Sequence, residues 1–221
     1  MDDQAYISLY HELTQKAMDS LFEKFKVNPK MILTESDLKC WLFLELTNEI
    51  ESQQNSTLSV HTEVTHYPRL PQDINKLFMR DLTILDSDKL ELNDALWDTT
   101  ATQGNNALHK GFMHDGPAMH FELKLIRQGQ SENSNLTLDV SDIANLNNVN
   151  ASNRAYTIVW GSKNERFDIK HLTTTLKDSF DDFNRAELIR NDLLRFYLFD
   201  TNTLRAYKLD DEKNLLEINK I

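Results

Sequence analysis

Hydrophobic residues recur every three to four positions in the first part of the chain, which predicts two amphipathic helices. The first covers about residues 4–27, with apolar side chains four apart: Leu9, Leu13, Ala17, Leu21 and Phe25. The second begins after Thr34 and runs through "ESDLKCWLFLELTNEIE". We expect Thr34 to cap this helix, and Asp37, three residues later, to complete a variant of the capping box.

The middle of the chain alternates apolar and polar positions, as β-strands with two different faces do. The expected strands are residues 58–65, 80–86, 118–127 and 155–162. Residues 87–117 lack a regular pattern and predict an insertion. "VSDIANL" at 140–146 predicts a short helix, and the end of the chain predicts a helix followed by a hairpin that turns at "DTNT" (200–203).

This order is neither a strict alternation of strands and helices nor all-β. It predicts an α/β (α+β) fold in which helices flank a mixed central sheet. The 221 residues suit one domain, 1–221. Within it we expect an N-terminal helix in 1–30, a core in 31–165 with the insertion at about 87–117, and a C-terminal helix and hairpin in 166–221.

The composition, with 40% hydrophobic and 27% charged residues, is that of a globular protein. The formal net charge of −11 argues against non-specific attraction to nucleic acids or anionic membranes, but a local basic groove remains compatible with it. Cys40 is the only cysteine, which excludes an internal disulfide and a multi-cysteine metal site; we expect it to be a small core residue.

The first ten residues carry two acids and neither a basic segment nor a long apolar one, so they do not predict a signal peptide. The apolar runs are too short to cross a bilayer. We therefore expect a cytoplasmic protein without a membrane partner.

Candidate chemistry lies on the strand "AMHFELKLIR", where alternation puts His120, Glu122 and Lys124 on one face. A carboxylate beside an ammonium group can hold a divalent cation if a second carboxylate helps, and Asp81 on the preceding strand is the candidate for it. Lys124 can then orient or deprotonate a water, or stabilise a charged transition state. The alternative is that Glu122 and Lys124 are a solvated salt-bridge pair.

The series of elements resembles the PD-(D/E)XK nuclease superfamily from about residue 34 to residue 160. It comprises a helix with an acid ("TESDLKCWLFLEL"), a strand ending in an acid ("VHTEV"), a strand beginning with Asp ("RDLTIL") and a strand with Glu-x-Lys ("HFELKLIR"), followed by an expected helix and strand. The resemblance implies a restriction-endonuclease-like fold. It also implies a nuclease that hydrolyses phosphodiester bonds in DNA with Mg²⁺, or Mn²⁺ in its place.

Carried over residue by residue, the resemblance implies that Asp81 and Glu122 are metal ligands, together with the carbonyl of Leu123. Lys124 becomes the catalytic lysine, and Glu35 the auxiliary catalytic acid on the helix.

The resemblance also implies that Glu63 is an acid beside these groups. We expect Arg80 beside them too, and His61 and His120 either beside the proposed site or as a proton relay. Arg80 departs from the family pattern, because it replaces the proline before the aspartate. A long insertion separates Asp81 from Glu122, and Asp86 or Asp88 is the alternative if Asp81 does not face Glu122.

A second cluster of candidate metal ligands consists of His109, His114, Asp115 and His120. Their spacing matches no zinc motif, and scattered loop histidines are the alternative reading. None of the five glycines forms a phosphate-binding motif, which argues against a nucleotide-driven motor.

Two other functions remain open. The chain can be an inactive nuclease-fold protein that binds or regulates a partner, or an acidic protein that inhibits a nucleic-acid-binding partner by presenting phosphate-like charge. A homodimer or a complex with another protein is compatible with each function.

Overall fold

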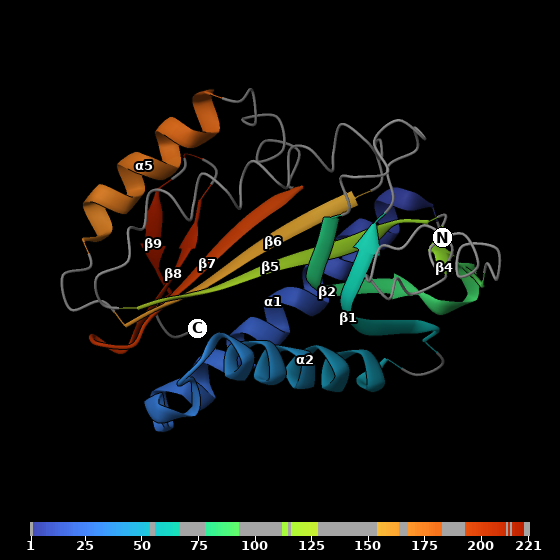
Figure 1. Cartoon of the computed structure of the whole chain (residues 1–221), viewed down its shortest axis with the longest axis horizontal. Coiled ribbons are helices and arrows are strands. Elements are labelled where there is room, and N and C mark those ends of the chain that lie inside the picture. The colour runs from blue at the N-terminus through green and yellow to red at the C-terminus, as the bar shows by residue number, and fades with distance from the viewer. Residues whose placement is uncertain are drawn as a thin grey trace, which may run out of the picture.

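The computed structural model describes residues 2–53, 56–66, 78–92, 112–114, 116–127, 154–163, 168–182, 193–210, 212 and 214–218. The α-helices are α1 (Asp3–Val27), α2 (Glu35–Ser52) and α5 (Ile169–Asp182), and the short 3-10 helices are η1 (Pro29–Met31) and η3 (Ser87–Lys89). The strands are β1 (Leu58–His66), β2 (Phe78–Asp86), β3 (Leu90–Leu92), β4 (Phe112–His114), β5 (Ala118–Ile126), β6 (Arg154–Ser162), β7 (Leu194–Asp200), β8 (Arg205–Leu209) and β9 (Leu215–Glu217). Figure 1 shows their arrangement.

Seven of these strands form one mixed sheet in the order β1-β2-β5-β6-β7-β8-β9. Strands β5, β6 and β7 run parallel to one another, and the other neighbours are antiparallel. The three strands expected at 58–65, 80–86 and 118–127 are therefore confirmed, and they are neighbours in the sheet. The mixed sheet flanked by helices is confirmed.

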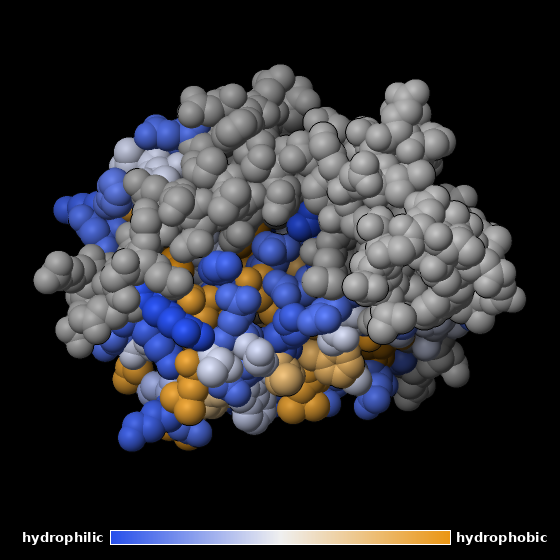
Figure 2. Space-filling view, in the orientation of Figure 1, coloured by the Kyte–Doolittle hydropathy of each residue, from blue (hydrophilic) through white to orange (hydrophobic). Residues whose placement is uncertain are grey.

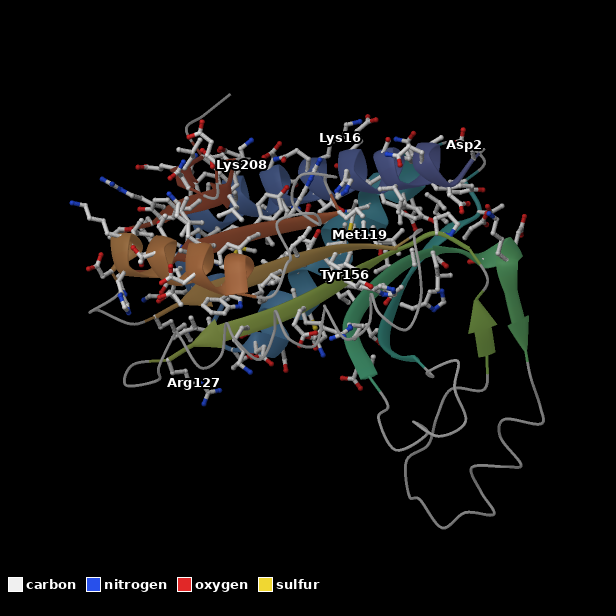
Figure 3. The ribbon with its side chains drawn as sticks, turned by 90° about the horizontal axis from the view of Figure 1, so that it is seen from above. Asp2, Lys16, Met119, Arg127, Tyr156 and Lys208 are labelled. Carbon is white, nitrogen blue, oxygen red and sulfur yellow. The ribbon has the colours of Figure 1, made fainter. Side chains whose placement is uncertain are left out.

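Helices cover both faces of the sheet (Figures 1 and 3). Apolar side chains of α1 and α2 form one buried cluster with one face of the sheet, which includes Phe121, Leu123 and Leu125 of β5. Leu172 and Leu176 of α5 form a second buried cluster on the opposite face. Because helices cover both faces of the sheet, most side chains of β5 are buried, whichever face they lie on.

The start of α2 follows from local sequence. The hydroxyl of Thr34 accepts from the Asp37 N–H at 3.1 Å, and the Asp37 carboxylate accepts from the Thr34 N–H at 2.8 Å, which confirms the capping box. Leu38 and Leu42 are fully buried at helical spacing. Cys40 lies off this stripe and is exposed, so the expectation of a core cysteine is wrong.

The expected terminal hairpin is confirmed as β7 and β8. The turn between them contains no glycine, and Leu204 takes the left-handed conformation there at φ 57°. Asp200 stabilises the turn by accepting the Asn202 N–H at 2.9 Å. Strand β9 extends the sheet beyond this hairpin and was not predicted.

The expected insertion at 87–117 contains η3 and a separate two-stranded sheet of β3 and β4, where we expected no regular structure. Its residues 93–111, like the expected short helix at 140–146, lie outside the described residues. No helix in the described part of the chain is long and apolar enough to span a membrane.

Candidate functional site

Strands β2 and β5 separate halfway along β5, and we call this place the fork. The last residue pair that joins them is Leu82 with Phe121, whereas β5 continues to Ile126. Beyond this pair, the β5 N–H groups that would face β2 need other acceptors. Figure 1 shows β1 and β2 diverging from β5 and β6.

Two carboxylates supply these acceptors. Oδ2 of Asp81 accepts from the Leu123 N–H at 2.9 Å, and Oε2 of Glu35 accepts from the Leu125 N–H at 3.2 Å. Side chains from β2 and from the first turn of α2 thus replace the missing strand. Glu35 and Asp81, which are far apart in sequence, meet at the same edge of β5.

The contact with Leu123 places the Asp81 carboxylate beside the peptide bond that joins Glu122 to Leu123. Since the N–H and C=O of one strand residue point to the same side, the Leu123 carbonyl also faces the fork. The Asp81 carboxylate therefore lies beside the backbone of Glu122 and Leu123, two of the expected metal ligands, whereas the Glu122 carboxylate pairs with Arg80. Figure 2 shows hydrophilic side chains gathered in the middle of the face drawn, between α2 and the sheet.

Lys39 joins this group and was not predicted. Its ammonium lies 2.7 Å from Oδ1 of Asp81 and 3.3 Å from Oε1 of Glu63, and only 20% of its side chain is exposed. Burial alone would lower the pKa of Lys39, but the hydrogen bond and negative charge of Asp81, with those of Glu63, raise it above its ordinary value. Lys39 therefore stays charged at neutral pH.

Glu63 reaches Lys39 from an unusual backbone conformation. Its φ of 52° lies in the left-handed region, which non-glycine residues rarely adopt. Glu63 falls opposite Asp81 in the register of β1 and β2, yet it is left out of the ladder between Thr62 and Val64. Such strain persists only where the surrounding structure imposes it, and it clusters at functional sites.

Glu122 pairs with Arg80. Oε2 of Glu122 lies 3.0 Å from a guanidinium nitrogen of Arg80, whose side chain is only 2% exposed. Lys124 is half-buried, and its side chain makes no hydrogen bond or ion pair with any residue in the described ranges. The structure therefore does not support the alternative of a solvated pair between Glu122 and Lys124.

The two histidines expected beside the site, His61 and His120, contact residues of the strands. Nδ1 of His120 lies 3.1 Å from the hydroxyl of Thr83, and its ring packs on Tyr156 with centroids 5.5 Å apart. At 1% exposure, His120 is a core histidine. Nε2 of His61 lies 2.7 Å from the hydroxyl of Ser59 on β1.

The second metal cluster stays a prediction. His109 and Asp115 lie outside the described residues, and only the backbone of His114 is described, in β4.

Asp86, the alternative to Asp81, has a structural role at the other end of β2. It accepts hydrogen bonds from the hydroxyls of Tyr6 at 2.8 Å and Thr57 at 2.6 Å, and from the Asp88 N–H at 3.1 Å. Burial would raise the pKa of Asp86, but these hydrogen bonds and nearby Lys89 hold it below its ordinary value. Asp86 therefore joins α1 to the sheet, and Asp81 remains the candidate at the fork.

The donor chemistry at the fork fits Mg²⁺ or Mn²⁺, which prefer carboxylate and carbonyl oxygens. Lys39 already holds a cationic group between Asp81 and Glu63. In the described residues, however, no three His, Cys, Asp or Glu side chains form a metal-binding group. The expected set contains two side chains, Asp81 and Glu122, with the Leu123 carbonyl, so the metal site stays a prediction.

Comparisons with known proteins do not identify a family. No protein-family model and no curated protein matches the chain. Among solved structures it is similar to the central domain of yeast acetyl-CoA carboxylase, with 9% identity and a TM-score of 0.32 over 94% of this chain and 34% of that one. The chain spans about a third of that structure's length, and so weak a likeness carries no argument about fold or function.

Proposed function

We propose that the chain is a metal-dependent nuclease with a restriction-endonuclease-like fold that hydrolyses phosphodiester bonds in DNA. One observation carries this proposal: the Asp81 carboxylate lies against the peptide bond between Glu122 and Leu123 at the fork, directly before Lys124. A carboxylate from β2 thus meets the Glu-x-Lys segment of β5 despite the long insertion between them. Glu35 reaches the same edge from α2.

Each residue at the fork has a part in the proposed chemistry. Asp81, Glu122 and the Leu123 carbonyl would hold the metal ion, which supplies Lewis acidity and an activated water. Glu35 fixes the edge of β5 through Leu125, as observed. Lys124 would position the attacking water or stabilise negative charge on the phosphate, and its ammonium has no ion pair among the described residues that would hold it elsewhere.

Positive charge beside the fork supports a phosphate-bearing substrate. Arg127, which Figure 3 labels at the carboxyl end of β5, is exposed. Lys163 follows β6, donates its backbone N–H to Ile126 at 2.9 Å and its ammonium to the Leu33 carbonyl at 2.7 Å. On a chain of net charge −11, a local group of cations is where a nucleic-acid backbone would bind.

The test is cleavage of supercoiled plasmid, linear DNA and single-stranded DNA with Mg²⁺ or Mn²⁺, and with EDTA as the metal-free reaction. The wild type should cleave at least one of these substrates only when metal is present. Glu122→Gln should abolish cleavage. Lys124→Ala should reduce it by at least about a hundredfold, the scale of a lost acid–base or electrostatic contribution.

Lys16→Ala is the matched control, because Lys16 is an exposed lysine of α1 that pairs only locally with Glu12 at 2.6 Å. This variant should cleave like the wild type. Equal cleavage by the wild type and Lys124→Ala would refute the catalytic role of Lys124. A wild type that cuts no substrate with either metal would refute the nuclease proposal.

A binding or regulatory protein without catalytic activity is the second candidate, and a specific observation favours it. Asp81 and Glu122 are each already paired with a cation of the protein, Lys39 and Arg80 respectively. If these pairs are permanent, the fork has a structural role only. Absence of metal-dependent cleavage together with retained binding of DNA or of a protein partner would support this function.

A further inference from the structure

Each of the two proposed metal-binding carboxylates forms an ion pair with a side chain of the protein, but these two cationic side chains differ in exposure. Arg80 is 2% exposed, and its pairing with Glu122 is part of the buried interior. The Lys39 side chain is 20% exposed, and its ammonium stands at the end of a long, flexible chain that begins on α2. Of the two, Lys39 can leave its carboxylate without opening the fold.

Lys39 also sits where an added cation would compete with it. Its ammonium contacts Oδ1 of Asp81, while Oδ2 of Asp81 accepts from the Leu123 N–H. Both oxygens of Asp81 are thus engaged. A divalent ion that binds Asp81 would lie within a few ångströms of the Lys39 ammonium, and like charges that close repel strongly in a partly buried site.

We infer that Lys39 is a built-in counter-cation of the fork, which a divalent metal ion must displace from Asp81 in order to bind. The inference rests on the proposed metal site. It adds regulation of that site: the ion pair keeps Asp81 and Glu63 together without metal, and it raises the metal concentration needed to load the site. The displaced ammonium stays beside the fork on α2, where it can donate hydrogen bonds to the phosphate of a substrate.

The first test measures Mn²⁺ binding by isothermal titration calorimetry, without any substrate. Lys39→Met removes the ammonium and keeps a long side chain with good helix propensity. It should bind Mn²⁺ at least about tenfold more tightly than the wild type, because no ion pair has to be broken. Lys16→Met, remote on α1, should bind like the wild type, and circular dichroism should show each variant folded.

Lys124→Met is the control for charge alone. Lys124 lies on β5, and its side chain makes no ion pair in the described part of the chain. It should tighten Mn²⁺ binding less than Lys39→Met does. An equal or greater effect of Lys124→Met would mean that general repulsion, and not displacement from Asp81, limits binding, and would overturn the inference.

A second test uses the wild type and does not depend on any variant. Brief acylation of lysine amines, read by peptide mass spectrometry, reports how accessible each ammonium is. Lys39 should be labelled slowly without metal and several times faster with saturating Mn²⁺, while the labelling of Lys16 stays constant. Labelling of Lys39 that does not change with Mn²⁺ would overturn the inference.

The outcomes separate this inference from the proposed function. If the wild type binds Mn²⁺ and cleaves DNA but Lys39→Met binds equally or more weakly, the counter-cation role is wrong and the nuclease stands. If neither protein binds Mn²⁺, both the counter-cation role and the proposed metal site are wrong.

Discussion

Arg80→Leu should destabilise the protein because it leaves the Glu122 carboxylate at the fork without its guanidinium partner. Leucine places an apolar side chain at this position, which is only 2% exposed. Removing one partner of a buried ion pair costs about 3–5 kcal/mol. Since 21% of the Glu122 side chain is exposed, water compensates part of this loss, and we expect a cost of about 2–3 kcal/mol.

The double variant Arg80→Leu/Glu122→Leu removes both charges. We expect it to regain much of the stability lost in Arg80→Leu, because no unpaired charge remains in a partly buried site. The interaction energy between the two residues should be about 1–2 kcal/mol in a double-mutant cycle that includes Glu122→Leu. The cycle therefore measures how firmly Arg80 holds Glu122 against any other cation.

The free energy of unfolding should be measured by urea titration with circular dichroism in metal-free buffer, where a shifted midpoint at constant slope reports stability. A loss below about 0.5 kcal/mol in Arg80→Leu would be the size of an ordinary surface substitution and would refute the buried-pair reasoning. A double variant whose loss equals the sum of the two single losses would also refute it, because additivity means no interaction.

Substitutions at three further positions test the fold. Asp86→Asn should cost about 1–2 kcal/mol at pH 7; since the folded-state pKa of Asp86 is lowered, this difference should be complete above the unfolded value of about 4 and shrink as pH falls through the folded value, in thermal melts from pH 7 to pH 3. Gly161→Ala should cost about 1–2 kcal/mol in urea unfolding, because an added Cβ would lie 2.7 Å from Leu125 Cδ1. Thr34→Ala should cost about 1 kcal/mol by losing the cap of α2, and Thr34→Ser should restore most of it.

The elements that could be predicted from the sequence are those whose signals are local. Helix α1 follows from apolar spacing, and the start of α2 from Thr34 and Asp37 at its first turn. Strands β2 and β5 follow from alternation. The small sheet of β3 and β4 and the short β9 were missed, because three residues are too few to show a period.

The fork itself could not be predicted, because no local pattern shows that two paired strands separate. Continued past Leu82 and Phe121, the register would put Arg80 opposite Leu123 and on the other face from Glu122. The ladder stops before that point, and Arg80 reaches Glu122 instead. Strict alternation is therefore misleading where β2 leaves β5.

Lys39 was missed for a related reason. It follows Glu35 by four positions, so both lie on the same side of α2, and this spacing was a usable signal. The sequence did not show that this side of α2 faces the fork. That depends on the packing of α2 against β1, β2 and β5.

The acids at the fork carry negative charge that their hydrogen bonds to the edge of β5 do not need. The N–H groups of Leu123 and Leu125 need only acceptors, which the amide oxygens of asparagine and glutamine would supply without charge. The carboxylates of Asp81 and Glu35 satisfy the same N–H groups but add negative charge in a partly buried place, where Glu63 shares Lys39 with Asp81. Such a group of charges is stable only with cations nearby.

The protein supplies two of these cations, Lys39 and Arg80, and neither contributes to the hydrogen bonds that close the edge of β5. An arrangement with structural purpose alone would reach the same closure with neutral side chains and fewer buried charges. The extra carboxylates and the strained Glu63 are instead what we expect of the proposed cation site. The proposed metal-dependent function therefore rests on the charges at the fork and not on the fold around them.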